Sequence, residues 1–242
     1  MPPGTPGWGA RAVALAGESD RTDLAAFLTR ALRLDEAAVV RLRRRGEGVL
    51  VAWVQTGFEV LATRIVRGTV QPADLCVAAD SLRAALTATA GTAKAIDPGW
   101  AMDSAWRGAL PPDEGFVHVD DVPARILVEL AQQGVALTRE AGAQGPPASL
   151  LAQEVLEVSG GEAPGGNETT VGVPMRMVFA LGAMGFVPTT GPDTTAAGGI
   201  DAGAIAADEV VRVRASNTWI RLDARFGSVY LRKSGGLGLS VL

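Results

Sequence analysis

The sequence predicts an α+β protein of two subdomains, each a three-stranded antiparallel meander covered by helices. Two stretches carry this prediction, VVRLRRRGEGVLVAW at 39–53 and VVRVRASNTWIRLDA at 210–224, in which apolar and arginine side chains alternate with the period of a strand. Helical patterns of apolar residues flank both stretches. The chain of 242 residues is long enough for one large domain or two small ones. The likeness of the two stretches fits either a duplicated unit or two sheets that obey the same alternation.

The composition is that of an ordinary globular protein, with 48% hydrophobic and 20% charged residues. A net charge of −4 argues against a dedicated nucleic-acid binder. Cys76 is the only cysteine, so neither an intrachain disulfide nor a thiolate-rich metal site is expected. No apolar run reaches membrane-spanning length and no secretory signal is evident, which predicts a cytoplasmic protein without membrane partners. The near absence of lysine beside abundant Ala, Gly and Val is typical of a high-GC, actinobacterial-type coding sequence.

Residues 1–19 are predicted to be an N-terminal tail, and residues 20–141 the first subdomain. A helix capped by Asp20 or Thr22 precedes the first meander, whose turns are expected at Gly46-Glu47 and Thr56-Gly57. Leu42 would then lie opposite Val51, and Trp53 opposite Val60. The expected core face has the members Val40, Leu42, Val49, Val51, Trp53, Val60 and Ala62. A slip of one residue would exchange the two faces of the sheet.

A second helix is predicted from Gln71-Pro72, which makes the order of elements α-β-β-β-α. Over residues 20–90 this order resembles the secretion-chaperone-like α+β fold, which implies a small binding protein without enzymatic activity. An irregular aromatic stretch follows, and a third helix is expected to start at Asp120 or Asp121 with Ile126 pointing inward. The linker at 142–147 is the predicted boundary between the subdomains.

Residues 148–242 are predicted to form the second subdomain. It comprises a hairpin of 154–158 with 169–173, a helix opened by Pro174, a mobile insertion at 188–208 and the second meander. With Ser216-Asn217 as the turn, Val213 would lie opposite Ile220. The segment TTVGVPMRMVFALGAMGF at 169–186 resembles the swapped-hairpin DNA-binding proteins at Val173, Pro174 and Arg176, and this resemblance implies DNA binding as an alternative.

Two arginine surfaces are candidate binding sites, because guanidinium groups beside aromatic rings are typical of nucleic-acid or protein recognition. The main candidate set is Arg212, Arg214, Trp219, Arg221, Tyr230 and Arg232. A second patch, Arg41, Arg43 and Arg45, is expected on an edge strand, where charge discourages aggregation. Each surface could instead be a solvated face or one neutralised by carboxylates.

Three further features could carry chemistry. His118 with Asp120 and Asp121 fits either a metal or acid–base site or a loop histidine beside helix-capping aspartates. Cys76, expected in a helix, fits small buried filler better than a reactive thiolate. The glycine-rich stretch at 159–166 lacks the order of a phosphate-binding loop, and no cofactor motif occurs.

The leading functional hypothesis is therefore a non-enzymatic cytoplasmic binding or assembly protein acting through protein–protein contacts, including self-association. The alternatives are a regulator that binds nucleic acid or an anionic small molecule on the arginine and aromatic surface, and an enzyme or metal site around His118.

Overall fold

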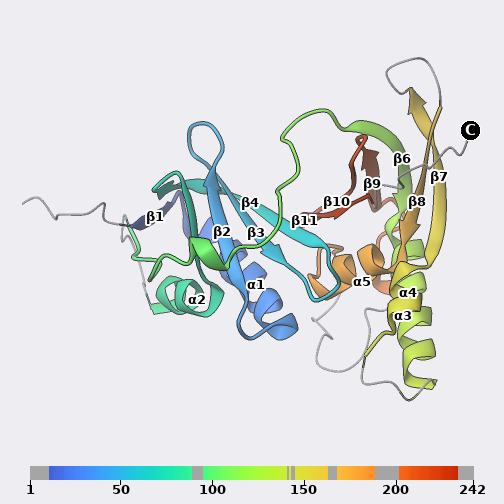
Figure 1. Ribbon diagram of the computed structural model, residues 1–242, viewed down its shortest axis with the longest axis horizontal. Coiled ribbons are helices and arrows are strands. Elements are labelled where there is room, and N and C mark those ends of the chain that lie inside the picture. The colour runs from blue at the N-terminus through green and yellow to red at the C-terminus, as the bar shows by residue number, and fades with distance from the viewer. Residues whose placement is uncertain are drawn as a thin grey trace, which may run out of the picture. The chain divides into compact units, whose positions relative to one another are not determined.

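The computed structural model describes residues 11–88, 95–140, 142, 145–162, 168–188 and 202–233 (Figure 1). The chain divides into two compact units, Met1–Gly57 with Leu61–Ala109 and Phe58–Val60 with Leu110–Leu242. The division falls ahead of the linker predicted at 142–147, because residues 117–140 pair and pack within the second unit. No helix within the described ranges is long and apolar enough to cross a membrane.

The first unit is a curved antiparallel sheet with two helices side by side on one face (Figure 1). Its strands follow the order β5-β2-β3-β4, and β1 pairs with β4. Its elements are β1 (Ala12–Leu15), α1 (Glu18–Leu34), β2 (Val39–Arg44), β3 (Val49–Gln55), β4 (Leu61–Gln71), β5 (Asp74–Ala78) and α2 (Ala79–Ala88), followed by a 3-10 turn at Asp103–Ala105. The predicted tail at 1–19 thus contains a strand and the start of α1, while Trp8 lies outside the described residues.

The first meander has the predicted strands in a different register. Arg45 donates a backbone hydrogen bond to Val49, so the turn holds three residues, with Gly46 and Gly48 both at a φ of 69°. Leu42 consequently lies opposite Ala52 rather than Val51. The next connection is also longer than predicted, with Gln55 opposite Leu61 and Trp53 opposite Thr63. Both shifts are odd, which exchanges the faces of β3 relative to its neighbours.

The corrected register decides which side of the sheet the helices cover. Arg64 on β4 lies opposite Ala52 and forms an ion pair with Asp23 of α1. The helices therefore cover the Leu42 and Ala52 side, and Trp53 lies on the other side of the sheet with Arg41. Residues 50–54 are all buried, which is why alternation along β3 could not reveal its inner face.

The helix predicted from Pro72 was wrong in its first turns. Asp74–Ala78 form β5, which pairs with β2, and α2 begins only at Ala79. β2 is therefore an interior strand and not the predicted edge. Leu75 and Val77 are buried on β5 together with Cys76. A short apolar run of this kind is compatible with a strand as well as with a helix. The predicted α-β-β-β-α order lacked both β1 and β5.

Helix α1 buries its predicted apolar stripe, including Leu24, Phe27 and Leu28, but begins at Glu18. Gly17 occupies the N-cap position without a side-chain hydrogen bond. Asp20, one of the two predicted caps, instead accepts hydrogen bonds from the backbone and side chain of Arg67 on β4. It fastens the first turn of the helix to the sheet.

The described residues of the second unit form a four-stranded antiparallel sheet, a separate hairpin and three helices. The sheet order is β11-β10-β9-β6, and β7 pairs with β8. Its elements are β6 (Val117–Pro123), α3 (Ala124–Glu140), α4 (Ala148–Ala152), β7 (Glu154–Glu162), β8 (Glu168–Pro174), α5 (Met175–Ala183), a 3-10 turn at Ala202–Ala204, β9 (Val210–Ala215), β10 (Trp219–Ala224) and β11 (Gly227–Arg232). The α+β class is confirmed, and each unit contains a three-stranded meander.

The second meander has the predicted faces. Leu222 lies opposite Val213 rather than Val211, and Ile220 lies opposite Ala215. This shift of two residues leaves every side chain on its predicted side. The hairpin and the helix after Pro174 are also where they were expected, with Met177, Val178 and Leu181 buried in α5.

The prediction of a helix capped by Asp120 or Asp121 was wrong, because residues 117–123 form a strand. They form β6, which pairs with β9 almost a hundred residues later, and α3 starts after Pro123. Leu127 and Val128 of α3 are buried, whereas Ile126, predicted to point inward, is 39% exposed. Gly134 lies inside α3 against Phe179 of α5, where a side chain would not fit.

In the predicted insertion at 188–208 Ile205 is buried, and residues 189–201 lie outside the described residues.

Candidate functional site

The six residues of the main candidate set share one face of the second-unit sheet. Arg214 lies opposite Arg221, which lies opposite Tyr230, while Trp219 lies opposite Arg232. We call this side of β6, β9, β10 and β11 the arginine face, with the members Arg212, Arg214, Trp219, Arg221, Tyr230 and Arg232. Alternation along the strands predicted this grouping, and the structure brings it together.

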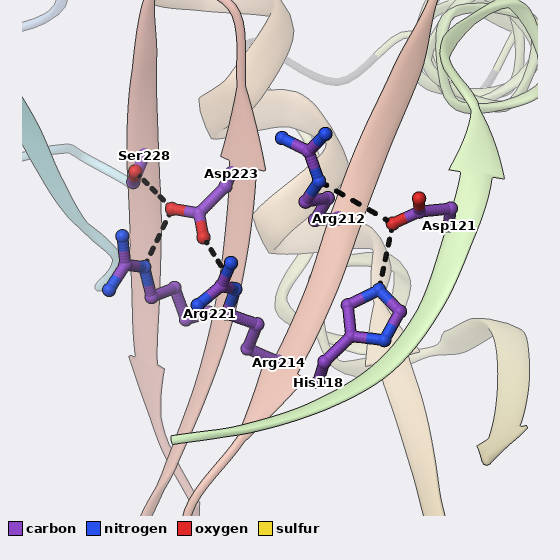
Figure 2. Close-up of polar contacts among 7 residues, drawn as sticks. All are labelled: His118, Asp121, Arg212, Arg214, Arg221, Asp223 and Ser228. Carbon is purple, nitrogen blue, oxygen red and sulfur yellow. Dashed lines mark hydrogen bonds and ion pairs between the residues drawn. The ribbon is translucent and has the colours of Figure 1, made fainter. Parts of the chain in front are cut away.

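Two arginines and a serine converge on Asp223 (Figure 2). Arg221 Nε donates to Asp223 Oδ1 over 2.6 Å, and Arg214 Nε lies 3.2 Å from Oδ2. The Ser228 hydroxyl donates to the same Oδ1. Only 14% of the Asp223 side chain is exposed, so the attraction between these charges is weakly screened. Sequence reasoning missed Asp223, although it stands two residues after Arg221 and must share its face.

A β-bulge places His118 and Asp121 on the same side. In a regular strand, residues three apart point to opposite faces. Here His118 lies opposite Arg214 and Asp120 opposite Val213, so Val119 is the additional residue of the bulge. His118 Nε2 and Asp121 Oδ1 are 2.8 Å apart as a result (Figure 2).

The hairpin packs directly on this bulge. A Cβ atom at Gly160 of β7 would collide with the backbone carbonyl oxygen of Val119. A residue without a side chain is therefore required where β7 crosses β6.

The three residues proposed for a metal do not converge. Asp120 lies opposite Val213, whose side belongs to the core, whereas His118 and Asp121 lie on the arginine face. The nearest further group to Asp121 is the guanidinium of Arg212, 3.9 Å away, and its positive charge disfavours a cation. Within the described part of the chain, no three His, Cys, Asp or Glu residues are grouped so as to hold a metal ion.

The aromatic rings of the arginine face are buried. Trp219 is 7% and Tyr230 5% exposed. Phe116 meets Tyr230 edge to face with 5.8 Å between ring centroids, and the guanidinium of Arg221 lies 5.7 Å from the Phe116 centroid and 5.2 Å from that of Tyr230. A platform for stacking nucleic-acid bases needs exposed ring faces. The rings of Phe116 and Tyr230 instead pack against the guanidinium of Arg221.

The cations without a close ion pair lie at two separate places on this face, near the start of β9 and at the end of β11. Arg212 is over half exposed and only distantly paired with Asp121. Arg232 and the adjacent Lys233 form no ion pair within the described ranges, and burial lowers the pKa of Lys233. The arginine face therefore holds a partly neutralised network around Asp223, with Arg212 near one end of the sheet and Arg232 and Lys233 at the other.

The second patch, on the first unit, is neutralised in the same way. Arg41 donates two hydrogen bonds to Asp74, of 2.8 and 2.7 Å, and Arg43 lies 3.3 Å from the same carboxylate. The guanidinium of Arg41 also lies 5.9 Å from the ring centroid of Trp106. Arg45 follows the end of β2 beside the turn.

Cys76 lies on β5 and not in a helix. Burial raises the pKa of its thiol to about 12, with a further contribution from Asp103. Such a thiol is protonated at neutral pH and is a poor nucleophile. The glycine-rich stretch at 159–166 enters β7, and residues 163–167 lie outside the described residues.

The fold is similar to that of DNA polymerase sliding clamps. The clamp of Bacillus subtilis aligns with a TM-score of 0.54 and 11% identity, covering 95% of this chain and 66% of the clamp. The DNA polymerase III beta subunit of Pseudomonas aeruginosa aligns at 0.51 and 12% identity, over 93% of this chain and 65% of that one. A sliding clamp of Bartonella birtlesii aligns at 0.50 and 14% identity, over 95% and 66%. The chain therefore spans about two thirds of the clamps' length, and at these identities the likeness concerns the fold alone.

The family models match the two units separately. A family described as domain of unknown function DUF8185 matches residues 111–236, just over half of the chain, and the chain belongs to this family. A family described as domain of unknown function DUF8010 matches residues 9–108. No curated protein matches the sequence.

Proposed function

We propose that this protein is a non-enzymatic binding or assembly protein that acts through protein–protein contacts, including contacts between its own copies. The observation that carries the proposal is the fold, which is similar to that of proteins described as polymerase clamps and polymerase subunits. A clamp-like fold favours, by analogy of fold, a role as a component of an assembly.

The site supports the same proposal. A protein surface that binds another protein buries its charges, and buried charges must be paired to be tolerated. Asp223 already pairs with Arg214 and Arg221, so this part of the arginine face can be covered at little further cost. Asp74 pairs with Arg41 in the same manner on the first unit.

Sedimentation velocity and native mass spectrometry test self-association. Across roughly a hundredfold range of concentration we expect species of two or more copies of the 24.9 kDa chain, growing with concentration by mass action. A strictly monomeric mass throughout, together with no stable partner recovered by crosslinking in cell extract, would remove the support for the proposal.

A second candidate function is nucleic-acid binding through the exposed cations of the arginine face. Exposed Arg212 and Arg232 favour it, as does the likeness to clamps of DNA polymerases. Binding through phosphate contacts weakens steeply with added salt. We expect the variant Arg212→Glu with Arg232→Glu to lose any mobility shift seen with DNA at low salt, and Arg83→Glu on exposed α2 to retain it. The absence of a shift for the unaltered protein at low salt would end this candidate.

The resemblance of residues 20–90 to the secretion-chaperone-like fold stays a prediction. It implies a binding protein without enzymatic activity, and so points to the same class of function.

A further inference from the structure

A groove follows β8 in the second unit. Two cavities of about 630 and 530 Å³ form it. Thr170 of β8 lines the first cavity and Thr169 the second, while Lys233 borders both. All the residues that line them belong to the second unit. The cavities are therefore neighbours along β8, and we call the two together the groove.

One wall of the groove is the edge of β8. Thr170, Val171 and Gly172 all line the first cavity, although successive side chains of a strand point to opposite faces. Three successive residues can line one space only if the backbone edge faces it. Among the described strands β8 pairs with β7 alone, so backbone N–H and C=O groups on this edge are open to a further strand.

The opposite wall is apolar at its base and cationic at its rim. Ile220 and Leu231 supply the apolar surface, and Arg232 and Lys233 the charge. Neither cation has an ion-pair partner among the residues described, and burial lowers the pKa of Lys233. An anion beside these groups would offset the cost of their partial desolvation.

Two acidic groups line the first cavity, and among the described residues Glu59 alone of the two is paired with a cation. Glu59 forms an ion pair with Arg176, whose Nε also donates to the Leu151 carbonyl oxygen over 3.3 Å. The carboxylate of Glu154 lies against the backbone of Gly172 on β8. Neither acid is paired with Arg232 or Lys233.

From these observations we propose that the groove binds an extended acidic peptide segment of a partner protein, added as a strand to the free edge of β8. Backbone hydrogen bonds to β8 would supply affinity, and carboxylates beside Arg232 and Lys233 would supply specificity. A compact anion would satisfy the cations but leave the strand edge unused. The inference rests on the proposed function for the class of partner and adds its chemistry and place.

Panning a random heptapeptide library against the full chain tests this, since β8 is 7 residues long. We expect selected peptides to combine Asp or Glu with β-branched residues in alternation. Arg232→Glu with Lys233→Glu should weaken their binding at least tenfold, and Arg83→Glu with the exposed Arg44→Glu, an equal change of charge, should not. Methylation of the alternate peptide nitrogens that face β8 should abolish binding, whereas methylation of the nitrogens that face away should not. The amides of β8 should gain protection from hydrogen exchange when the peptide binds.

Failure of the library to yield binders, or binders indifferent to both charge reversal and backbone methylation, would overturn the inference. Binding to free glutamate or phosphate at the same affinity would overturn it as well. None of these results would touch the proposed function, which the mass and crosslinking measurements decide separately.

Discussion

Asp223 and Arg221, two residues apart on β10, are joined by a hydrogen bond of 2.6 Å between Oδ1 and Nε. Because they share a face with Arg214 on the next strand, one carboxylate pairs with two guanidinium groups and offsets one of their two positive charges. This arrangement reduces the positive charge of the predicted basic surface.

Replacement of Asp223 should lower the stability of the folded protein. Asp223→Ala leaves Arg214 and Arg221 partly buried without a counter-charge, and we expect a loss of about 2–3 kcal/mol in the free energy of unfolding. Asp121→Ala is the control, because its contacts with Arg212, at 3.9 Å, and with His118, at 2.8 Å, are both exposed, and it should cost under about 1 kcal/mol. Urea denaturation followed by circular dichroism measures both. Equal losses would show that Asp223 has no special role.

Gly160→Ala tests the contact between the hairpin and the bulge. Its Cβ would meet the carbonyl oxygen of Val119, which is backbone and cannot move aside like a side chain. We expect a loss of about 2–4 kcal/mol, with perturbed NMR signals for His118. Gly145→Ala, where the new methyl group meets nothing within 4 Å, should be almost neutral. A fully stable Gly160→Ala protein would contradict the crossing of β6 and β7.

Stability should fall at low pH partly through Asp20. Burial alone would raise the pKa of Asp20, but the backbone N–H and guanidinium of Arg67 outweigh it and hold the pKa below 3.8. A lowered pKa in the folded state means that the contribution to stability is complete above the unfolded pKa of about 3.9 and is lost as the pH falls through the folded value. The advantage of the wild type over Asp20→Asn should therefore be constant from pH 7 to about 5 and shrink below about 4. Asp80→Asn, at an exposed position on α2, serves as the control, and a pH-independent difference for Asp20→Asn would refute the assignment.

Cys76 should resist thiol reagents in the folded protein. Burial raises the pKa of its thiol to about 12, so almost no thiolate is present at pH 8. We expect one thiol to react with Ellman's reagent only after denaturation. In the variant Ser81→Cys, at an exposed position of α2, a second thiol should react at once. Rapid labelling of the native wild type would mean that β5 opens far more readily than its burial indicates.

An error in the predicted register of a meander changed the predicted faces only where the register moved by an odd number of residues. In the second meander the prediction for the turn after Ala215 was wrong. The register moved by two residues, so Arg214 and Arg221 stayed on the predicted face. In the first meander the three-residue turn moved the register by one, and Trp53 lies beside Arg41 instead of Val40. The rule of alternation is the same in both cases.

Tertiary pairing accounts for the elements that were missed. Residues 74–78 and 117–123 are short segments that local patterns assigned to helix starts. Each is a strand because a distant partner, β2 or β9, supplies its hydrogen bonds. Propensity over a few residues is too weak to compete with such pairing.

The sequence by itself determined the α+β class, both meanders, the hairpin, α5 and the membership of the arginine face, because these follow from local periodicity. Only the tertiary structure decided that Asp223 neutralises this face, that a bulge joins His118 to Asp121, and that the edge of β8 borders a groove. Each of these depends on which strands lie side by side and in which register. The pairing of β6 with β9 and the placing of β8 near the end of β11 join segments far apart in the chain, and no local pattern encodes them.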